Sequence, residues 1–148
     1  MRLAVAFLCA LAAAGFGACS SGEDVNLTVE QAVSDLVDSL AAKDAAKLAS
    51  LMDISREEAG GLIANSFAGL ASEVRLVEDP DRKPECDELS DEQRDNGLSA
   101  LCRIGADLQF RGSSDELWQD LTLQFVVEIC RGRPIVSSDT EQFEPKCR

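Results

Sequence analysis

The feature that most constrains this fold is a pair of consecutive segments in which apolar and polar side chains alternate. In residues 100–111 the even positions are apolar and most odd positions are polar, and in residues 117–130 the parity is inverted. A period of two fits a β-strand and not a helix. The run Gly112-Ser113-Ser114-Asp115 between the two segments is typical of a turn. The sequence therefore predicts an antiparallel hairpin with one apolar and one polar face.

The alternation assigns the hairpin side chains to faces. The apolar face receives Cys102, Ile104, Ala106, Leu108, Phe110, Leu117, Leu121, Leu123, Phe125, Val127 and Ile129. The polar face receives Arg103, Asp107, Gln109, Arg111, Trp118, Asp120, Thr122, Gln124, Val126, Glu128 and Cys130. Burial at a twisted sheet edge is the simplest interpretation of Trp118. The alternative is a partner or dimer surface formed by Trp118, Thr122 and Val126, since exposed aromatic residues favour interfaces.

Upstream of the hairpin, apolar residues recur at helical spacing. Thr28-x-x-Gln31 has the form of a capping box, and it opens a stripe that consists of Val29, Val33, Leu36, Val37 and Leu40. We therefore expect a helix that begins at Thr28. Asp44 is the expected N-cap of a second helix, and Ser55-x-x-Glu58 is the capping box of a third that extends to Leu70.

Short strands flank the hairpin on both sides. Val74 and Leu76 predict one of them, and Ile135 and Val136 predict the other. Residues 78–96 contain two prolines, nine acidic and three basic residues, which indicates a solvated loop. Helices followed by a strand meander predict an α+β domain, in which N-terminal helices pack on a curved antiparallel sheet of three to four strands.

The N-terminal residues have the pattern of a secretory signal peptide. Arg2 precedes an apolar run that ends at Ala14, and small residues follow. The run is shorter than the roughly 20 residues that cross a bilayer. Phe16-Gly17-Ala18-Cys19 resembles the lipobox of bacterial lipoproteins, with Phe16 in place of the usual leucine. This resemblance implies cleavage after residue 18 and a lipid, palmitate included, on Cys19. The alternative is a soluble secreted protein that begins at Cys19.

The lipoprotein resemblance sets the expected location and domain organisation. Ser20 implies a lipid-anchored protein of the cell envelope, at the periplasmic face of the outer membrane. Residues 1–18 are then the signal peptide, residues 19–27 a lipidated tether and residues 28–148 a single domain. The chain has a formal net charge of −13, and the signal peptide contains no acidic residue. This charge opposes nucleic-acid binding, so the lipid is the expected contact with the membrane.

Four cysteines remain once Cys9 and Cys19 are set aside, an even number in an oxidising compartment. Strand parity places Cys102 and Cys130 on opposite faces of the sheet, so these two are not expected to bond. We therefore predict that Cys86 pairs with Cys102 and that Cys130 pairs with Cys147. The chain has no histidine and no C-x-x-C spacing, so no metal site is expected.

The segments from Thr28 to Val33 and from Leu40 to Leu48 resemble the first two helices of NTF2-like domains found in small bacterial lipoproteins. The two long strands and the short last one fit the end of that pattern. The resemblance implies a cone-shaped α+β fold whose mouth, between helix and sheet, often holds a small molecule. Arg131-Gly132-Arg133-Pro134-Ile135 replaces the Gly-x-Trp ending that is common in the family.

No catalytic constellation is apparent. The chain lacks histidine and tyrosine, so acid–base chemistry would depend on carboxylates such as Asp107 or Glu128, which strand parity places on the polar face. We therefore expect a non-enzymatic binding or assembly module without a cofactor, which meets an envelope protein or a second copy of itself. The alternative is a small-molecule site or enzyme in the cone, unless Phe67, Leu108, Phe110 and Phe125 fill it.

Overall fold

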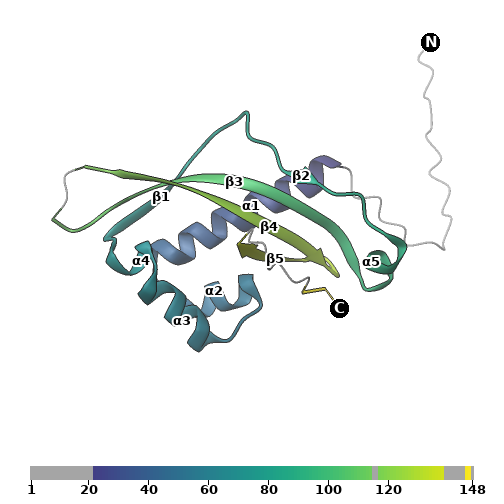
Figure 1. The fold of residues 1–148 in the computed structure, drawn as a ribbon, viewed down its shortest axis with the longest axis horizontal. Coiled ribbons are helices and arrows are strands. Elements are labelled where there is room, and N and C mark those ends of the chain that lie inside the picture. Colours follow the sequence, from purple (N-terminus) through teal and green to yellow (C-terminus); the bar gives the residue numbers. More distant parts are fainter. Residues whose placement is uncertain (1–21, 115–116, 139–145, 148) are drawn as a thin grey trace, which may run out of the picture.

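The computed structural model describes residues 22–114, 117–138, 146 and 147 of the chain. Figure 1 shows helices on one side of a curved sheet whose two longest strands run across the molecule. The elements in order are α1 (Gly22–Ala41), α2 (Ala45–Met52), α3 (Arg56–Asn65), α4 (Phe67–Leu70), β1 (Glu73–Val77), β2 (Glu85–Cys86), α5 (Asp91–Asp95), β3 (Leu98–Arg111), β4 (Gln119–Cys130) and β5 (Arg133–Ser138).

The sheet is antiparallel, with the strand order β1-β3-β4-β5, and β2 pairs with β3 beyond the end of β1. The predicted hairpin is confirmed as β3 and β4, in which Cys102 lies opposite Val127 and Leu108 opposite Leu121. A two-residue turn joins β4 to β5. Its residues Arg131 and Gly132 both have positive φ (51° and 81°), which suits the twist of a tight hairpin. The described sheet has five strands, against the expected three to four.

Helices α1 to α4 cover the apolar face of the sheet, here called the inner face. Buried residues of α1, α2 and α3 meet the inner side chains of β3 and β4, and the ring of Phe67 packs at a tilt against Phe110, with ring centroids 5.3 Å apart. The core formed in this way contains Val29, Ala32, Val33, Leu36, Val37, Leu40, Leu48, Ala49, Ala59, Ile63, Ala68, Ala100, Cys102, Ile104, Ala106, Leu108, Phe125, Val127, Ile129 and Val136. Burial of this apolar surface stabilises the predicted α+β arrangement, which is the one expected of an NTF2-like cone.

The first helix is longer than the sequence analysis predicts. α1 already includes Gly22, so Thr28 lies inside it, and the Thr28 hydroxyl donates to the Asp24 carbonyl oxygen (2.9 Å) instead of capping a helix end. Glu23 and Asp24 lie in the first turn, where carboxylates interact favourably with the helix dipole. Residues 22–27 of the expected tether therefore belong to a helix.

The caps of the next helices are confirmed. The Asp44 carboxylate accepts from the backbone N–H groups of Ala46 and Lys47, and Ser55 and Glu58 form a reciprocal capping box. The hydrogen bonds with Ser55 lower the pKa of Glu58. The third predicted helix is divided in two, because the Ser66 hydroxyl caps a new turn at Ala68. This separates α3 from α4.

The acidic excursion contains short regular elements that the sequence analysis did not predict. Cys86 of β2 lies opposite Cys102, and the predicted disulfide between these cysteines is present. Ser90 and Gln93 form a capping box at the start of α5. The composition of this segment indicates only a loop. Strand pairing with β3 and the capping box of α5 nevertheless give parts of it a regular structure.

The polar face of the sheet, here called the outer face, is buried at one end. Val126 and Glu128 are each 1% exposed, and Val126 packs with Leu98 and Leu101 in a second core. Leu89, Cys130 and Cys147 complete this cluster. The assignment of Val126 and Glu128 to this face is correct, but the expectation that they meet solvent is wrong. The segment before β3 and the C-terminal residues return over them.

Residues 1–18, Cys19 and the rest of the stretch up to residue 21 lie outside the described residues. The signal peptide and the lipobox therefore remain sequence predictions. Among the helices of the described part of the chain, none combines the length and the apolar character needed to cross a membrane.

Candidate functional site

A groove of about 690 Å³ lies between the N-terminal half of α1 and the region where β1 ends. Its size is within the range of small-ligand sites. Leu27, Val33, Leu76, Ile104 and Ala106 supply apolar walls. The remaining lining consists of Glu30, Gln31, Ser34, Val77, Glu78, Asp79, Pro80, Arg82, Lys83 and Gly105. Leu27 is 64% exposed and Val77 37% exposed, so the groove leaves large apolar side chains uncovered.

The groove reaches a gap in the sheet. β1 pairs with β3 as far as Val77 opposite Asp107, and β2 resumes with Glu85 opposite Arg103. Gly105 lies between these two pairings, and neither strand lies opposite it. The intervening residues 78–84 rise away from the sheet as an arch, visible at the top of Figure 1. One position of the β3 edge is therefore left without a neighbouring strand on this side.

The backbone of Gly105 points into this gap. The Leu101 carbonyl oxygen accepts from Asp87 N–H, and the Arg111 carbonyl oxygen accepts from Ser72 N–H, so odd-numbered residues of β3 direct their backbone groups away from β4. The N–H and C=O of Gly105 follow the same parity. A Cβ atom at position 105 would approach the Gln124 amide to about 3.0 Å, so glycine suits this crowded position.

Ion pairs fix the arch to the outer face. Arg82 Nη2 lies 2.6 Å from Asp107 Oδ2 and 3.6 Å from Asp79 Oδ2, and the Thr122 hydroxyl donates to Asp107 Oδ1 at 2.6 Å. The hydrogen bonds from Thr122 and then Arg82 lower the pKa of Asp107. The Arg82 charge is thus directed to these carboxylates. The Asp107 carboxylate acts as an anchor for the arch and not as a poised base.

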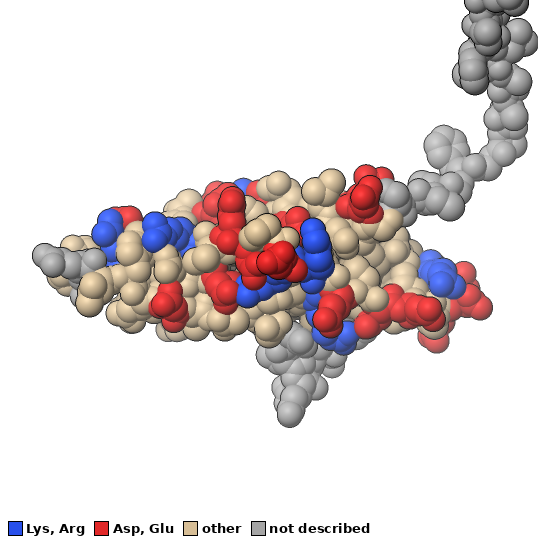
Figure 2. All heavy atoms as spheres, turned by 90° about the horizontal axis from the view of Figure 1, so that it is seen from above, with Lys and Arg blue, Asp and Glu red and all other residues tan. Residues whose placement is uncertain are grey.

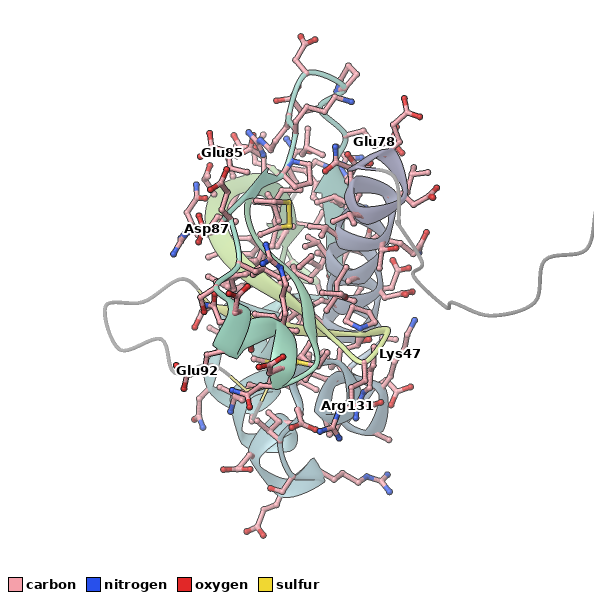
Figure 3. The ribbon with its side chains drawn as sticks, turned by 90° about the vertical axis from the view of Figure 1, so that its right-hand side faces the viewer. Lys47, Glu78, Glu85, Asp87, Glu92 and Arg131 are labelled. Atoms are coloured by element: carbon pink, nitrogen blue, oxygen red, sulfur yellow. A yellow bond between two sulfur atoms is a disulfide. The ribbon has the colours of Figure 1, made fainter. Side chains whose placement is uncertain are left out.

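The charges that remain at the groove are mainly negative. Figure 3 shows Glu78 beside the N-terminal part of α1, and Glu30 lines the groove from α1 itself. Lys83 is a cation of the same lining. Figure 2 shows acidic side chains spread over this side of the molecule, with basic ones between them and no continuous basic patch. The groove therefore combines an apolar wall with an acidic rim.

The interior between helices and sheet is packed with apolar side chains. Leu108 and Phe125 belong to the core, and Phe67 packs against Phe110, so the four residues whose packing would count against a site in the cone contact the interior. Asp107 lies on the outer face and is held by Arg82 and Thr122. Among the described side chains, no group of three or more Cys, Asp or Glu residues is arranged to hold a metal ion.

The predicted partner surface is only partly available. Trp118 is half-buried, with the guanidinium carbons of Arg75 and Arg111 4.0 and 4.7 Å from its ring centroid. Thr122 is exposed and engaged with Asp107, whereas Val126 is buried in the second core. The structure therefore does not join these three residues into one exposed patch. Trp118 belongs to a cation–π stack at the open end of the sheet.

Cys130 and Cys147 meet at the opposite end of the outer face as free thiols. Burial, and then the hydrogen bond with Cys147, raises the pKa of Cys130 to about 12. The N–H of Lys146 donates to Glu128 Oε2 at 2.9 Å, and Glu128 Oε1 is buried without a hydrogen-bond partner. The two cysteines are thus placed together as predicted, and the second disulfide stays a prediction.

The resemblance implied a ligand site between helix and sheet, but none of the residues that line the groove was predicted as a site residue. These residues come from α1, β1, the arch and β3, which no sequence motif connects. One residue of the groove could have been suspected from the sequence, because Leu27 is apolar but lies outside the helical stripe that packs in the core. The gap at Gly105 depends on strand pairing and could not be found in this way.

Comparisons with known proteins find one similar solved structure. No family model matches the chain, and no curated protein matches it. Among solved structures, a designed NTF2-like protein is similar, with a TM-score of 0.49 and 16% sequence identity. The similarity covers 74% of this chain and 91% of the designed chain.

Proposed function

We propose that this chain is a non-enzymatic binding module of the cell envelope, anchored by a lipid on Cys19, and that the groove beside α1 is its ligand site. One observation supports the site above all others. A groove of about 690 Å³ combines uncovered apolar side chains with an unpaired position of the β3 edge at Gly105. Apolar walls with a few polar groups are typical of ligand sites.

The early start of α1 supports a position of the groove close to the membrane surface. Only residues 20 and 21 separate Cys19 from α1, a reach of about 11 Å to Gly22 at most. Leu27 is five residues further along the helix, or about 7.5 Å at 1.5 Å per residue. A lipid on Cys19 would therefore hold the groove within roughly 20 Å of the bilayer surface. The proposed location is the periplasmic face of the outer membrane.

The ligand site is tested with a neutral apolar dye. We expect Nile red to gain fluorescence on binding the protein and the variant Ser34→Trp to abolish the gain, because an indole at this half-buried lining position fills the groove. Asp38→Trp is the matched control, since it adds the same side chain to an exposed position of α1 outside the lining. Equal dye binding by Ser34→Trp and the unchanged protein would contradict the proposed site.

The anchor is tested separately. Metabolic labelling with radioactive palmitate should mark the unchanged chain in a bacterial host, and Cys19→Ala should remove the label. Membrane fractionation should then release the Cys19→Ala protein into the soluble envelope fraction. A labelled Cys19→Ala protein would exclude Cys19 as the lipid site.

A further inference from the structure

We infer that the groove recognises an extended segment of another polypeptide, one that places an apolar side chain next to a lysine or arginine. The inference rests on the proposed function, because it names the ligand of the same groove. Three independent observations support it, and they concern the backbone at Gly105, the apolar wall and the charge of the rim.

The first observation is the unpaired backbone of Gly105. Its N–H and C=O point in the same direction, between the Val77–Asp107 and Glu85–Arg103 pairings. A ligand that satisfies both groups must offer an acceptor and a donor with the spacing of a polypeptide backbone, as in β-strand addition. The gap is one residue wide, so it admits one residue of a peptide and not a complete additional strand.

The second observation is the apolar wall next to this position. Ile104 and Ala106 flank Gly105 and direct their side chains to the inner face, where they line the groove with Leu76 and Val33. When one peptide residue pairs with Gly105, the residues before and after it in the peptide direct their side chains to the inner face, within reach of this wall. Val33, Ile104 and Ala106 are themselves buried, so the apolar surface of the groove that is open to water belongs mainly to Leu27, Leu76 and Val77. An apolar side chain of the peptide would cover this surface.

The third observation is charge. Glu30 and Glu78 line the groove from two different elements, α1 and the arch. Arg82 is held by Asp107 and Asp79, which leaves Lys83 as the other cation of the lining. A basic residue beside the apolar one would therefore be attracted to the rim. The net charge of −13 favours a basic partner over an acidic one at longer range as well.

The inference is tested by selection from a displayed library of random heptapeptides on the purified protein. We expect enriched sequences with an apolar residue next to Lys or Arg, and at least a tenfold loss of affinity for them in Ser34→Trp. Asp38→Trp should bind as the unchanged protein does. No enrichment, enrichment of acidic sequences, or equal binding by Ser34→Trp would overturn the inference.

Modified peptides and a pair of charge variants distinguish specific binding of the peptide in the groove from general electrostatic attraction to the acidic protein. Methylation of the backbone nitrogen of the peptide residue that pairs with Gly105 should weaken binding about tenfold, because it removes one buried hydrogen bond and adds bulk. Glu78→Lys should weaken binding by a similar factor, whereas Glu57→Lys, an exposed change of equal charge on α3, should not. If a scan of N-methylated peptides finds no sensitive position, or if Glu57→Lys acts as strongly as Glu78→Lys, the inference is wrong.

The dye experiment keeps the two proposals distinguishable. If Nile red binds in the groove and no peptide is selected, the groove is a ligand site for another class of molecule and only the polypeptide inference fails. If the dye does not bind in the groove and no peptide is selected, both proposals fail.

Discussion

The two ends of the outer face of the sheet belong to the same strands and differ in what covers them. At the open end, the guanidinium groups of Arg75 and Arg111 lie over the ring of Trp118, and Thr122 meets solvent. At the covered end, Val126 and Glu128 are buried by residues that precede β3 and by the C-terminal residues. Strand parity thus determines the face of a side chain. Its exposure depends on which distant segments return to that face.

The largest expected effect concerns the attachment of the C-terminal residues at the covered end. Cys130 and Cys147 lie together, and we expect them to form a disulfide in the oxidised protein. By lowering the chain entropy of the unfolded state, this bond should add about 3 kcal/mol to the free energy of unfolding. Cys147→Ser should lower the stability by that amount in a denaturant titration. Peptide mapping without reduction should show the bond.

Reduction provides the control for this experiment. Mild reductant should bring the unchanged protein to the stability of Cys147→Ser and leave that variant nearly unchanged, provided that the Cys86–Cys102 bond stays intact. Two free thiols after treatment with a small-molecule disulfide would show that the covered end is held by packing alone.

The next largest effect is expected from Val126→Thr. This change keeps the side-chain shape but places a hydroxyl in the second core, beside Leu98 and Leu101, at a cost of about 2 kcal/mol. Denaturant unfolding would measure the loss. A change below about 0.5 kcal/mol would mean that the covered end admits water in solution.

A smaller effect is expected from Trp118→Ala at the open end. The variant removes the ring that contacts two guanidinium groups, and a cation–π contact at a partly exposed site contributes about 1 kcal/mol. Leu117→Ala is the matched control, since Leu117 is 80% exposed and should tolerate truncation. If Trp118→Ala instead changes the oligomeric state or removes an envelope partner, Trp118 is a partner surface as well.

The smallest effect is expected from Thr122→Val, the reverse of the change at position 126. Loss of the hydroxyl should return the pKa of Asp107 toward its ordinary value of 3.8, as measured by a carboxyl NMR titration. The lowered pKa stabilises the fold at pH values above 3.8, and this contribution is lost as the pH falls through the native value. Thr122→Val should therefore make stability less sensitive to acid below pH 3.8. An unchanged Asp107 titration would assign the lowered pKa to Arg82 alone.

The sequence predicts the repetitive parts of this fold well. Alternation identifies β3 and β4, local capping chemistry identifies α2 and the start of α3, and spacing with parity identifies the Cys86–Cys102 bond. These signals are local or depend on a single hairpin, so they can be read without knowledge of the tertiary structure.

The remaining features depend on chain segments that meet only in the folded structure. The burial of Glu128 requires the C-terminal residues, and the gap at Gly105 requires both β1 and β2 to pair with β3. The early start of α1 also escapes the pattern, because residues 22–27 carry few apolar side chains for a stripe. The groove is a product of these arrangements and has no signature of its own in the sequence.

The position of Pro134 in β5 has a consequence for the behaviour of the protein at high concentration. β5 is an outer strand of the sheet, where the backbone of another copy could add to the edge. Proline has no N–H to give to such a neighbour, which is why it is tolerated in edge strands and interrupts their extension. Like charges on two copies of this acidic chain add a repulsive term. At high concentration, this edge would therefore resist sheet-to-sheet aggregation.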